Sequence, residues 1–148
     1  MSWLKWIALW EVGWWLRRRQ LRDSLFKQAQ LRARALGRPL VVVGAPDQGW
    51  TAGPGCGDVT IDIAPSQCPN FIQADLAKGT GLGSNSSVVF VSCVLEYVED
   101  FEGSMRELHR IAGAPENLFV VLVAPWTLAG QFYPGVRRSI SEGMLKKP

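Results

Sequence analysis

The chain has 148 residues, 47% of them hydrophobic, which is enough to form one buried core and favours a single folded domain. Its net charge of +3 is unevenly distributed: residues 1–38 hold nine Lys and Arg against two acidic residues, and the remainder holds seven against eleven. This asymmetry excludes a uniformly basic chain and predicts that only the N-terminal segment has an anionic partner.

The first predicted element is a helix over residues 3–16, which contain five of the seven tryptophans. At ~100° per residue, four of these share one helix face: Trp3, Trp6, Trp10 and Trp14. Three consecutive arginines follow: Arg17, Arg18 and Arg19. Fourteen helical residues extend about 21 Å, so we do not expect this helix to cross a hydrocarbon core of about 30 Å.

Three partners remain open for this segment. Tryptophan beside arginine favours a helix lying on an anionic membrane surface. The same apolar face is also suited to a larger protein assembly or to the chain's own sheet. Nucleic acid is disfavoured, because no aromatic or glycine pattern of a known reader accompanies the arginines. A secretory signal fits poorly, since the arginines follow the apolar segment instead of preceding it. We therefore expect a cytoplasmic protein, peripheral to a membrane or an assembly.

A charged helical stretch continues to residue 36, and Gly37 and Pro39 end it. Its thin apolar stripe is predicted to cover a sheet face, and consists of Leu21, Leu25, Ala29 and Leu36. Residues 1–37 thus form a helical arm, residues 38–140 the domain, and residues 141–148 a tail.

The domain shows short runs typical of buried strands, which we place at residues 40–43, 58–63, 88–93 and 118–123. Between the last two, a helical period over residues 101–112 puts Phe101, Met105, Leu108 and Ala112 on one face. A strand, helix and strand in this order predict an α/β fold with a mostly parallel sheet covered by helices on both faces. Residues 45–57 are too rich in glycine and proline for a helix, so we expect a wide loop.

The three cysteines, Cys56, Cys68 and Cys93, have no metal-ligand spacing, and the chain has one histidine, so no metal site is expected. An odd number leaves one thiol over in any disulfide scheme, and we expect a reducing compartment.

The run VVFVSCVLEYVEDFEGSMRELHRIAG, followed by LFVVLVAP, resembles the second half of a class I S-adenosylmethionine-dependent methyltransferase of the small-molecule type. The resemblance covers roughly residues 38–140 and implies a small Rossmann-like sheet, with residues 70–76 as its short third strand and S-adenosylmethionine as cofactor. The matching positions include Ser92, Cys93, Leu95, Glu96 and Tyr97.

The resemblance also implies cofactor-binding positions. Gly44 matches the first glycine of the loop near the methionine part, Asp62 the acidic residue that binds the ribose hydroxyls, and Asp75 the residue that holds the adenine amino group. Ser92 and Cys93 would line the same site. Trp126, Phe132 and Tyr133 would lie on the substrate side. No catalytic residue is indicated, and the acidic residues of the 96–102 turn have an ordinary role beside a helix start.

Two functions follow from these features. The first is methyl transfer from S-adenosylmethionine to a small or lipid-like acceptor, by a protein tethered through its N-terminal helix. The second is a non-catalytic module of the same fold in a membrane-associated or larger assembly. The second is favoured by departures from the family pattern, since Pro46 and Gln48 replace the later loop glycines and the first crossover helix is missing.

Overall fold

The computed structural model of the chain describes residues 3–47, 54–123, 127–128, 136–138 and 140–145. Its centre is a five-stranded sheet in which every pairing is parallel and the strand order is β3-β2-β1-β4-β5. The strands are β1 (Leu40–Val43), β2 (Val59–Asp62), β3 (Phe71–Gln73), β4 (Val88–Ser92) and β5 (Leu118–Val121). The predicted α/β fold is confirmed, and the sheet is compatible with a Rossmann-like architecture.

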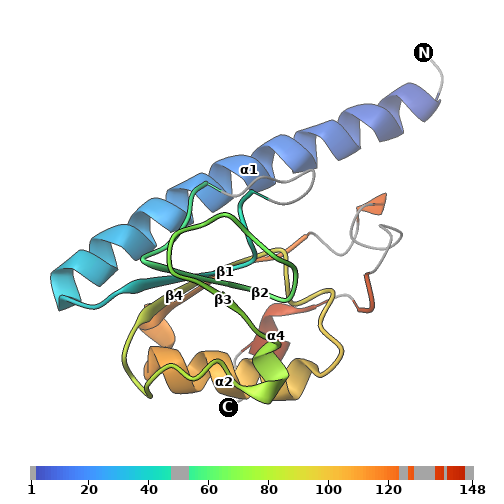
Figure 1. Cartoon of the computed structure of the whole chain (residues 1–148). Helices are drawn as coiled ribbons and strands as arrows, with labels where there is room; N and C mark the ends of the chain where they lie inside the picture. Colours follow the sequence, from blue (N-terminus) through green and yellow to red (C-terminus); the bar gives the residue numbers. More distant parts are fainter. Residues whose placement is uncertain (1–2, 48–53, 124–126, 129–135, 139, 146–148) are drawn as a thin grey trace.

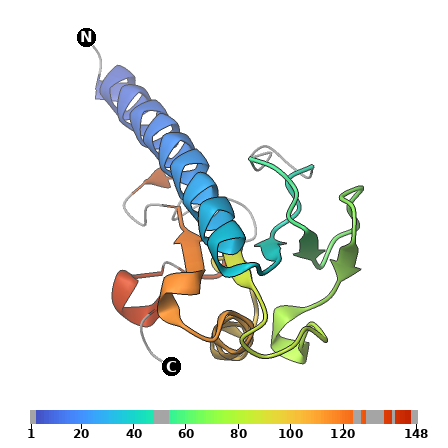
Figure 2. The same cartoon turned by 90° about the vertical axis from the view of Figure 1, so that its left-hand side faces the viewer.

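Helices cover the two faces of this sheet (Figures 1 and 2). One face carries α1 (Trp3–Leu36), a single continuous helix, and the other carries α2 (Phe101–Ala112). The Asp100 side chain caps α2 by accepting a hydrogen bond from the Gly103 N–H, at 2.8 Å. The shorter elements are the 3-10 turns η1 (Leu76–Lys78) and η2 (Pro115–Asn117) and the helix α4 (Glu142–Leu145).

Alternate residues of the central strands supply the two halves of the core, as the two-residue period of a strand requires. Val41 and Val91 pack in the cluster beneath α2. Val42 and Phe90 pack in the cluster beneath α1, where the rings of Phe26 and Phe90 meet edge to face at 5.2 Å. Both faces of the sheet are therefore buried, which explains the unbroken apolar runs in the sequence.

The prediction of a buried apolar stripe on the charged part of α1 was wrong for two of its four residues. Leu21 and Leu36 are exposed, whereas the buried residues of α1 are Arg22, Phe26, Ala29 and Ala33. The two alanines let the helix approach the strands closely, and Phe26 fills the remaining space against Phe90. Leu25 packs partly against this cluster, as expected.

The protruding Trp-rich part of α1 continues the same helix beyond the region that packs on the sheet (Figure 1). In the part of the chain that the structure describes, no helix combines the length and apolar character that a membrane crossing needs.

Candidate functional site

The carboxyl ends of the parallel strands bring most of the predicted site residues to one edge of the sheet. Asp62 and Ser92 end β2 and β4, and Gly44 and Cys93 directly follow β1 and β4. From β1 the chain adds β2 and then β3 on one side of the sheet. It then returns to form β4 on the other side of β1, so the direction in which strands are added reverses between β1 and β4. In open α/β sheets, ligands bind outside the carboxyl ends of the strands at such a reversal.

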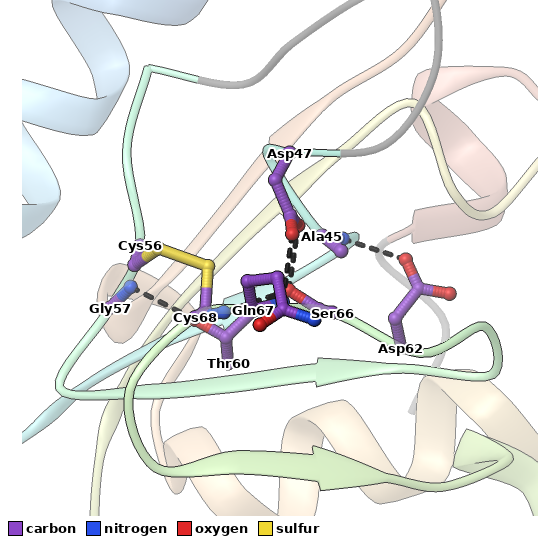
Figure 3. The surroundings of a disulfide bond; sticks show 9 residues. All are labelled: Ala45, Asp47, Cys56, Gly57, Thr60, Asp62, Ser66, Gln67 and Cys68. Carbon is purple, nitrogen blue, oxygen red and sulfur yellow. Dashed lines mark hydrogen bonds between the residues drawn. A yellow bond between two sulfur atoms is a disulfide. The ribbon is translucent and has the colours of Figure 1, made fainter.

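Asp62 holds the two loops that flank it, and Figure 3 shows its hydrogen bond with Ala45. Its Oδ2 accepts a hydrogen bond from the Ala45 N–H at 2.6 Å, and its Oδ1 accepts one from the Ala64 N–H at 3.0 Å. A carboxylate has about four acceptor positions, so both oxygens retain a lone pair for a further donor. The half-buried Asp62 side chain therefore stabilises the edge and still offers acceptor capacity to a ligand.

Gly44 has a structural reason to be glycine. Its φ is +95°, and a Cβ placed on it would lie 2.7 Å from the Cγ2 of Val94. The side chain of Val94 thus lies against the backbone of Gly44, and a larger residue would require both strain and a shift of Val94. The first loop and the β4–α2 connection are in contact at the point where the winding of the sheet reverses.

Cys93 has a φ of +53°, an uncommon conformation for a residue other than glycine, asparagine or aspartate. Its N–H donates to the carbonyl of Val121 at 2.8 Å, which fixes this turn to the end of β5. Burial, together with the nearby negative charge of Glu96, raises the pKa of the Cys93 thiol to about 11. The thiol is therefore protonated at neutral pH and suits a lining role better than nucleophilic chemistry.

Asp75 lies at the same edge, two residues beyond β3, but its side chain serves the local backbone. One oxygen accepts from the Ala77 N–H at 3.1 Å and caps η1, and the other lies 3.6 Å from the Nζ of Lys78. The end of β3 is tied to Asp62 by a hydrogen bond from the Ala74 N–H to the Asp62 carbonyl, at 3.0 Å. Asp62 and Asp75 are thus linked through backbone.

Glu96 has a larger role than the sequence indicated. It is 2% exposed, and its Oε1 accepts a hydrogen bond from the Val123 N–H at 2.6 Å. Within the described residues, its Oε2 is buried and makes no hydrogen bond. Burial raises the pKa of this carboxyl group. Glu96 therefore ties the β4–α2 connection to the segment after β5, beside the candidate site.

A disulfide joins Cys56 to Cys68, with 5.7 Å between their Cα atoms (Figure 3). Cys93 is the free cysteine, the thiol that an odd number of cysteines leaves over, and the reducing compartment expected from the sequence stays a prediction. The bond connects the segment before β2 to the segment after β2. The spacing of the cysteines in the sequence does not reveal this pairing, because the segments before and after β2 meet only in the folded parallel sheet.

Asp47, in the loop after β1, is hydrogen-bonded to the segment after β2 that also carries Cys68. Its Oδ2 accepts from the Gln67 N–H at 2.8 Å and its Oδ1 accepts from the Ser66 hydroxyl at 2.6 Å (Figure 3). These hydrogen bonds lower the pKa of Asp47, and the bond from the Gln67 N–H has the largest effect. No helix occurs in the described parts of the predicted wide loop, residues 45–47 and 54–57, whereas 48–53 lie outside the described residues.

The predicted substrate-side aromatics, Trp126, Phe132 and Tyr133, also lie outside the described residues. On α1, the predicted partner-binding tryptophans differ in exposure: Trp3, Trp6 and Trp10 are exposed, whereas Trp14 is half-buried. The guanidinium group of Arg17 lies 5.8 Å from the Trp14 ring centre, and Arg18 is half-buried beside the exposed Arg17 and Arg19.

Comparisons of the chain with protein-family models, with characterised proteins and with solved structures find no match.

Proposed function

We propose that the chain is a methyltransferase-like protein that binds S-adenosylmethionine at the carboxyl edge of its sheet. The observation that carries this proposal is the position of Gly44, Asp62 and Ser92 at the strand ends around the reversal point between β1 and β4. That edge is where a parallel α/β sheet receives a nucleoside-containing ligand.

In this proposal each residue of the edge has a role suited to its chemistry. The backbone after β1 approaches the methionine part, because Gly44 has no side chain there. The remaining lone pairs of Asp62 accept hydrogen bonds from the ribose hydroxyls. Asp75 accepts from the adenine amino group, and Ser92 and Cys93 lie beside the bound cofactor. The bound cofactor supplies an electrophilic methyl group, and transfer to a small or lipid-like acceptor requires mainly proximity and in-line orientation.

A non-catalytic module of the same fold, working in a membrane-associated or larger assembly, is the second candidate. The contacts of Asp62 favour it, because both carboxylate oxygens already accept backbone hydrogen bonds within the chain. The local cap made by Asp75 favours it in the same way.

Calorimetric titration of S-adenosylhomocysteine into the full chain tests the first function. We expect measurable heat, and we expect Asp62→Ala to weaken binding about 10-fold to 100-fold, the range typical of lost hydrogen bonds to a charged group. Asp62→Asn is the milder companion variant, because its amide oxygen still accepts one backbone hydrogen bond.

Asp58→Ala is the matched control for this titration. Asp58 also holds the backbone, accepting from the Leu40 N–H at 2.8 Å, but it lies at the amino ends of the strands. Its replacement removes a comparable tether and should leave the affinity unchanged. An absence of heat at millimolar ligand with the native chain would reject cofactor binding and leave the non-catalytic module.

A further inference from the structure

The N-terminal half of α1 exposes an unusual amount of apolar surface. We define the arm as residues 3–19 of α1. Its most exposed large side chains include Trp3 at 69%, Trp6 at 62%, Leu9 at 58% and Trp10 at 54%. A soluble protein rarely leaves so large a contiguous apolar surface in water, so this surface indicates a partner.

The arm has a domain-facing side and an outward side. On the domain-facing side, Glu11 Oε1 accepts a hydrogen bond from the Leu128 N–H at 2.8 Å, and Trp14 and Arg18 are half-buried. Trp6 and Trp10 are exposed at the spacing of neighbouring helix turns, and the ring centre of Trp10 lies 5.7 Å from that of Trp14. The outward surface, the part of the arm that is available to a partner, therefore consists of its exposed side chains and carries Trp3, Trp6 and Trp10.

The exposed charge on the arm has one sign. Lys5, Arg17 and Arg19 are exposed, whereas Glu11, the arm's acidic residue, is half-buried and engaged with Leu128. The guanidinium group of Arg19 lies 5.7 Å from the centre of the Trp15 ring. Trp15 and Arg19 thus occupy the same part of the arm's surface.

We propose that the outward surface of the arm binds an anionic membrane surface. The tryptophan ring is apolar and its N–H needs a polar partner, so this side chain fits the boundary between acyl chains and headgroups. The exposed cations have lipid phosphates as complementary partners at the same depth. The exposed Lys5 fits a protein interface less well than lipid headgroups, because protein interfaces are depleted of lysine.

The arm projects toward the candidate site. Because β1 begins shortly after α1 ends, the helix runs back along the sheet, and its N-terminal half extends past the carboxyl ends of the strands (Figure 1). A membrane-bound arm therefore places the carboxyl edge near the lipid headgroups. That a lipid-like acceptor reaches the site from the membrane rests on the proposed function, whereas membrane binding by the arm does not.

Vesicle flotation of the full chain tests this proposal. We expect the chain to float with vesicles of phosphatidylcholine and phosphatidylglycerol and to bind pure phosphatidylcholine far more weakly. The triple variant Trp3→Ser, Trp6→Ser, Trp10→Ser should lose on the order of 10-fold or more of this binding. Arg17→Gln and Arg19→Gln should each weaken binding to the anionic vesicles about fivefold.

Leu21→Ser combined with Leu31→Ser is the matched control, because both leucines are exposed on the same helix outside the arm, at 53% and 62%. This variant should float like the native chain. Equal flotation of the triple tryptophan variant and the native chain would overturn the proposal. So would an absence of flotation accompanied by a dimer on size-exclusion chromatography that the triple variant abolishes, which would assign the surface to a second copy.

Hydrogen exchange on the vesicle-bound chain gives the position of the membrane. We expect amides of the arm and of the carboxyl-edge segments 62–64 and 92–99 to exchange more slowly, and those of the amino-edge segments 80–87 and 113–117 to stay unchanged. Slowing at the amino edge instead would contradict the proposed placement, even if flotation and cofactor titration both succeeded.

Discussion

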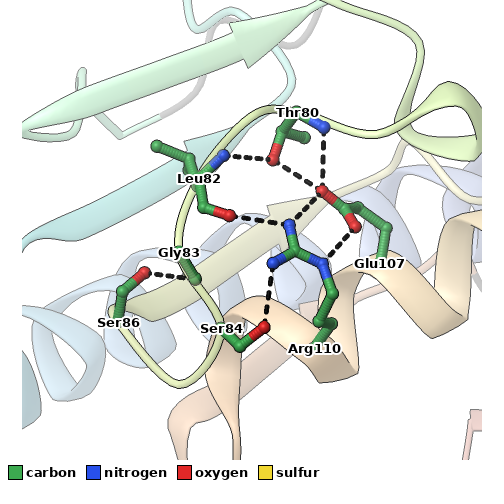
Figure 4. A network of polar contacts seen from close by, with 7 residues as sticks. All are labelled: Thr80, Leu82, Gly83, Ser84, Ser86, Glu107 and Arg110. Carbon is green, nitrogen blue, oxygen red and sulfur yellow. Dashed lines mark hydrogen bonds and ion pairs between the residues drawn. The ribbon is translucent and has the colours of Figure 1, made fainter.

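Replacement of Glu107 by alanine is expected to lower the free energy of unfolding by about 3 kcal/mol. The Oε1 of Glu107 accepts hydrogen bonds from both the N–H and the hydroxyl of Thr80, at 2.8 and 2.7 Å (Figure 4). The guanidinium group of Arg110 donates to both carboxylate oxygens, at 2.7 and 2.8 Å. Alanine would leave the buried donors of Thr80 without an acceptor and Arg110 without its anion.

Chemical denaturation at neutral pH measures this effect, with Glu102→Ala as the control. Glu102 is exposed in the first turn of the same helix, so its replacement should change the free energy of unfolding by less than about 1 kcal/mol. Similar losses for the two variants would show that the network of Glu107 contributes little.

The same carboxylate predicts a pH dependence. The hydrogen bonds from Arg110, with those from Thr80, lower the pKa of Glu107 from 4.5 to about 2 in the folded chain. A carboxylate with a lowered folded-state pKa stabilises the fold above the unfolded-state pKa and loses this contribution as the pH falls. Native stability should therefore decrease between pH 4.5 and about 2 more steeply than that of Glu107→Gln, and parallel curves would contradict this prediction.

Opening of the Cys56–Cys68 disulfide is expected to lower the free energy of unfolding by about 3 kcal/mol, the value typical of a loop of about 15 residues. The two cysteines are separated by 12 positions, so the bond mainly restricts the unfolded chain. Denaturation with and without a phosphine reductant measures the change. The double variant Cys56→Ser, Cys68→Ser should be destabilised to a similar extent and should not respond to the reductant.

Alkylation of the unfolded, unreduced chain followed by mass spectrometry identifies the thiols directly. We expect modification of Cys93 alone, and modification of all three cysteines only after reduction. Three modified cysteines without reductant would show that the bond is absent.

The sheet and α2 could be predicted because the apolar pattern of each segment fits one type of secondary structure. Val88 to Val91 are apolar at every position, which only a strand covered on both faces buries. The spacing of Phe101, Met105 and Leu108 likewise fits only one face of a helix. The predicted boundaries of β1 and α2 therefore match those observed, at Leu40–Val43 and Phe101–Ala112.

The tertiary details were beyond local patterns. Leu21 and Leu36 fit a helical period, but α1 packs on the strands beside Phe90 through Phe26, Ala29 and Ala33 instead. The disulfide requires knowledge that the loops on either side of β2 meet. The engagement of Asp62 with Ala45 follows from the course of a loop rich in glycine and proline, which no periodicity specifies.

The cofactor-binding roles that we propose for Gly44, Asp62 and Asp75 are based on the sequence resemblance and on their shared position at the carboxyl edge of the sheet. Their positions after β1, at the end of β2 and beyond β3 agree with the order that the resemblance implies. The bonds that already engage both aspartates supply the reason for the alternative of a non-catalytic module.

Amide chemical-shift mapping of S-adenosylhomocysteine binding to the isotope-labelled full chain tests the cofactor site most directly. We expect saturable shifts at residues 44–45, 62–64, 75 and 92–94, and none at the amino-edge residues 57–58 and 85–87. No shifts at millimolar ligand, or shifts confined to the amino edge, would contradict a nucleoside site between the strand ends of β1 and β4.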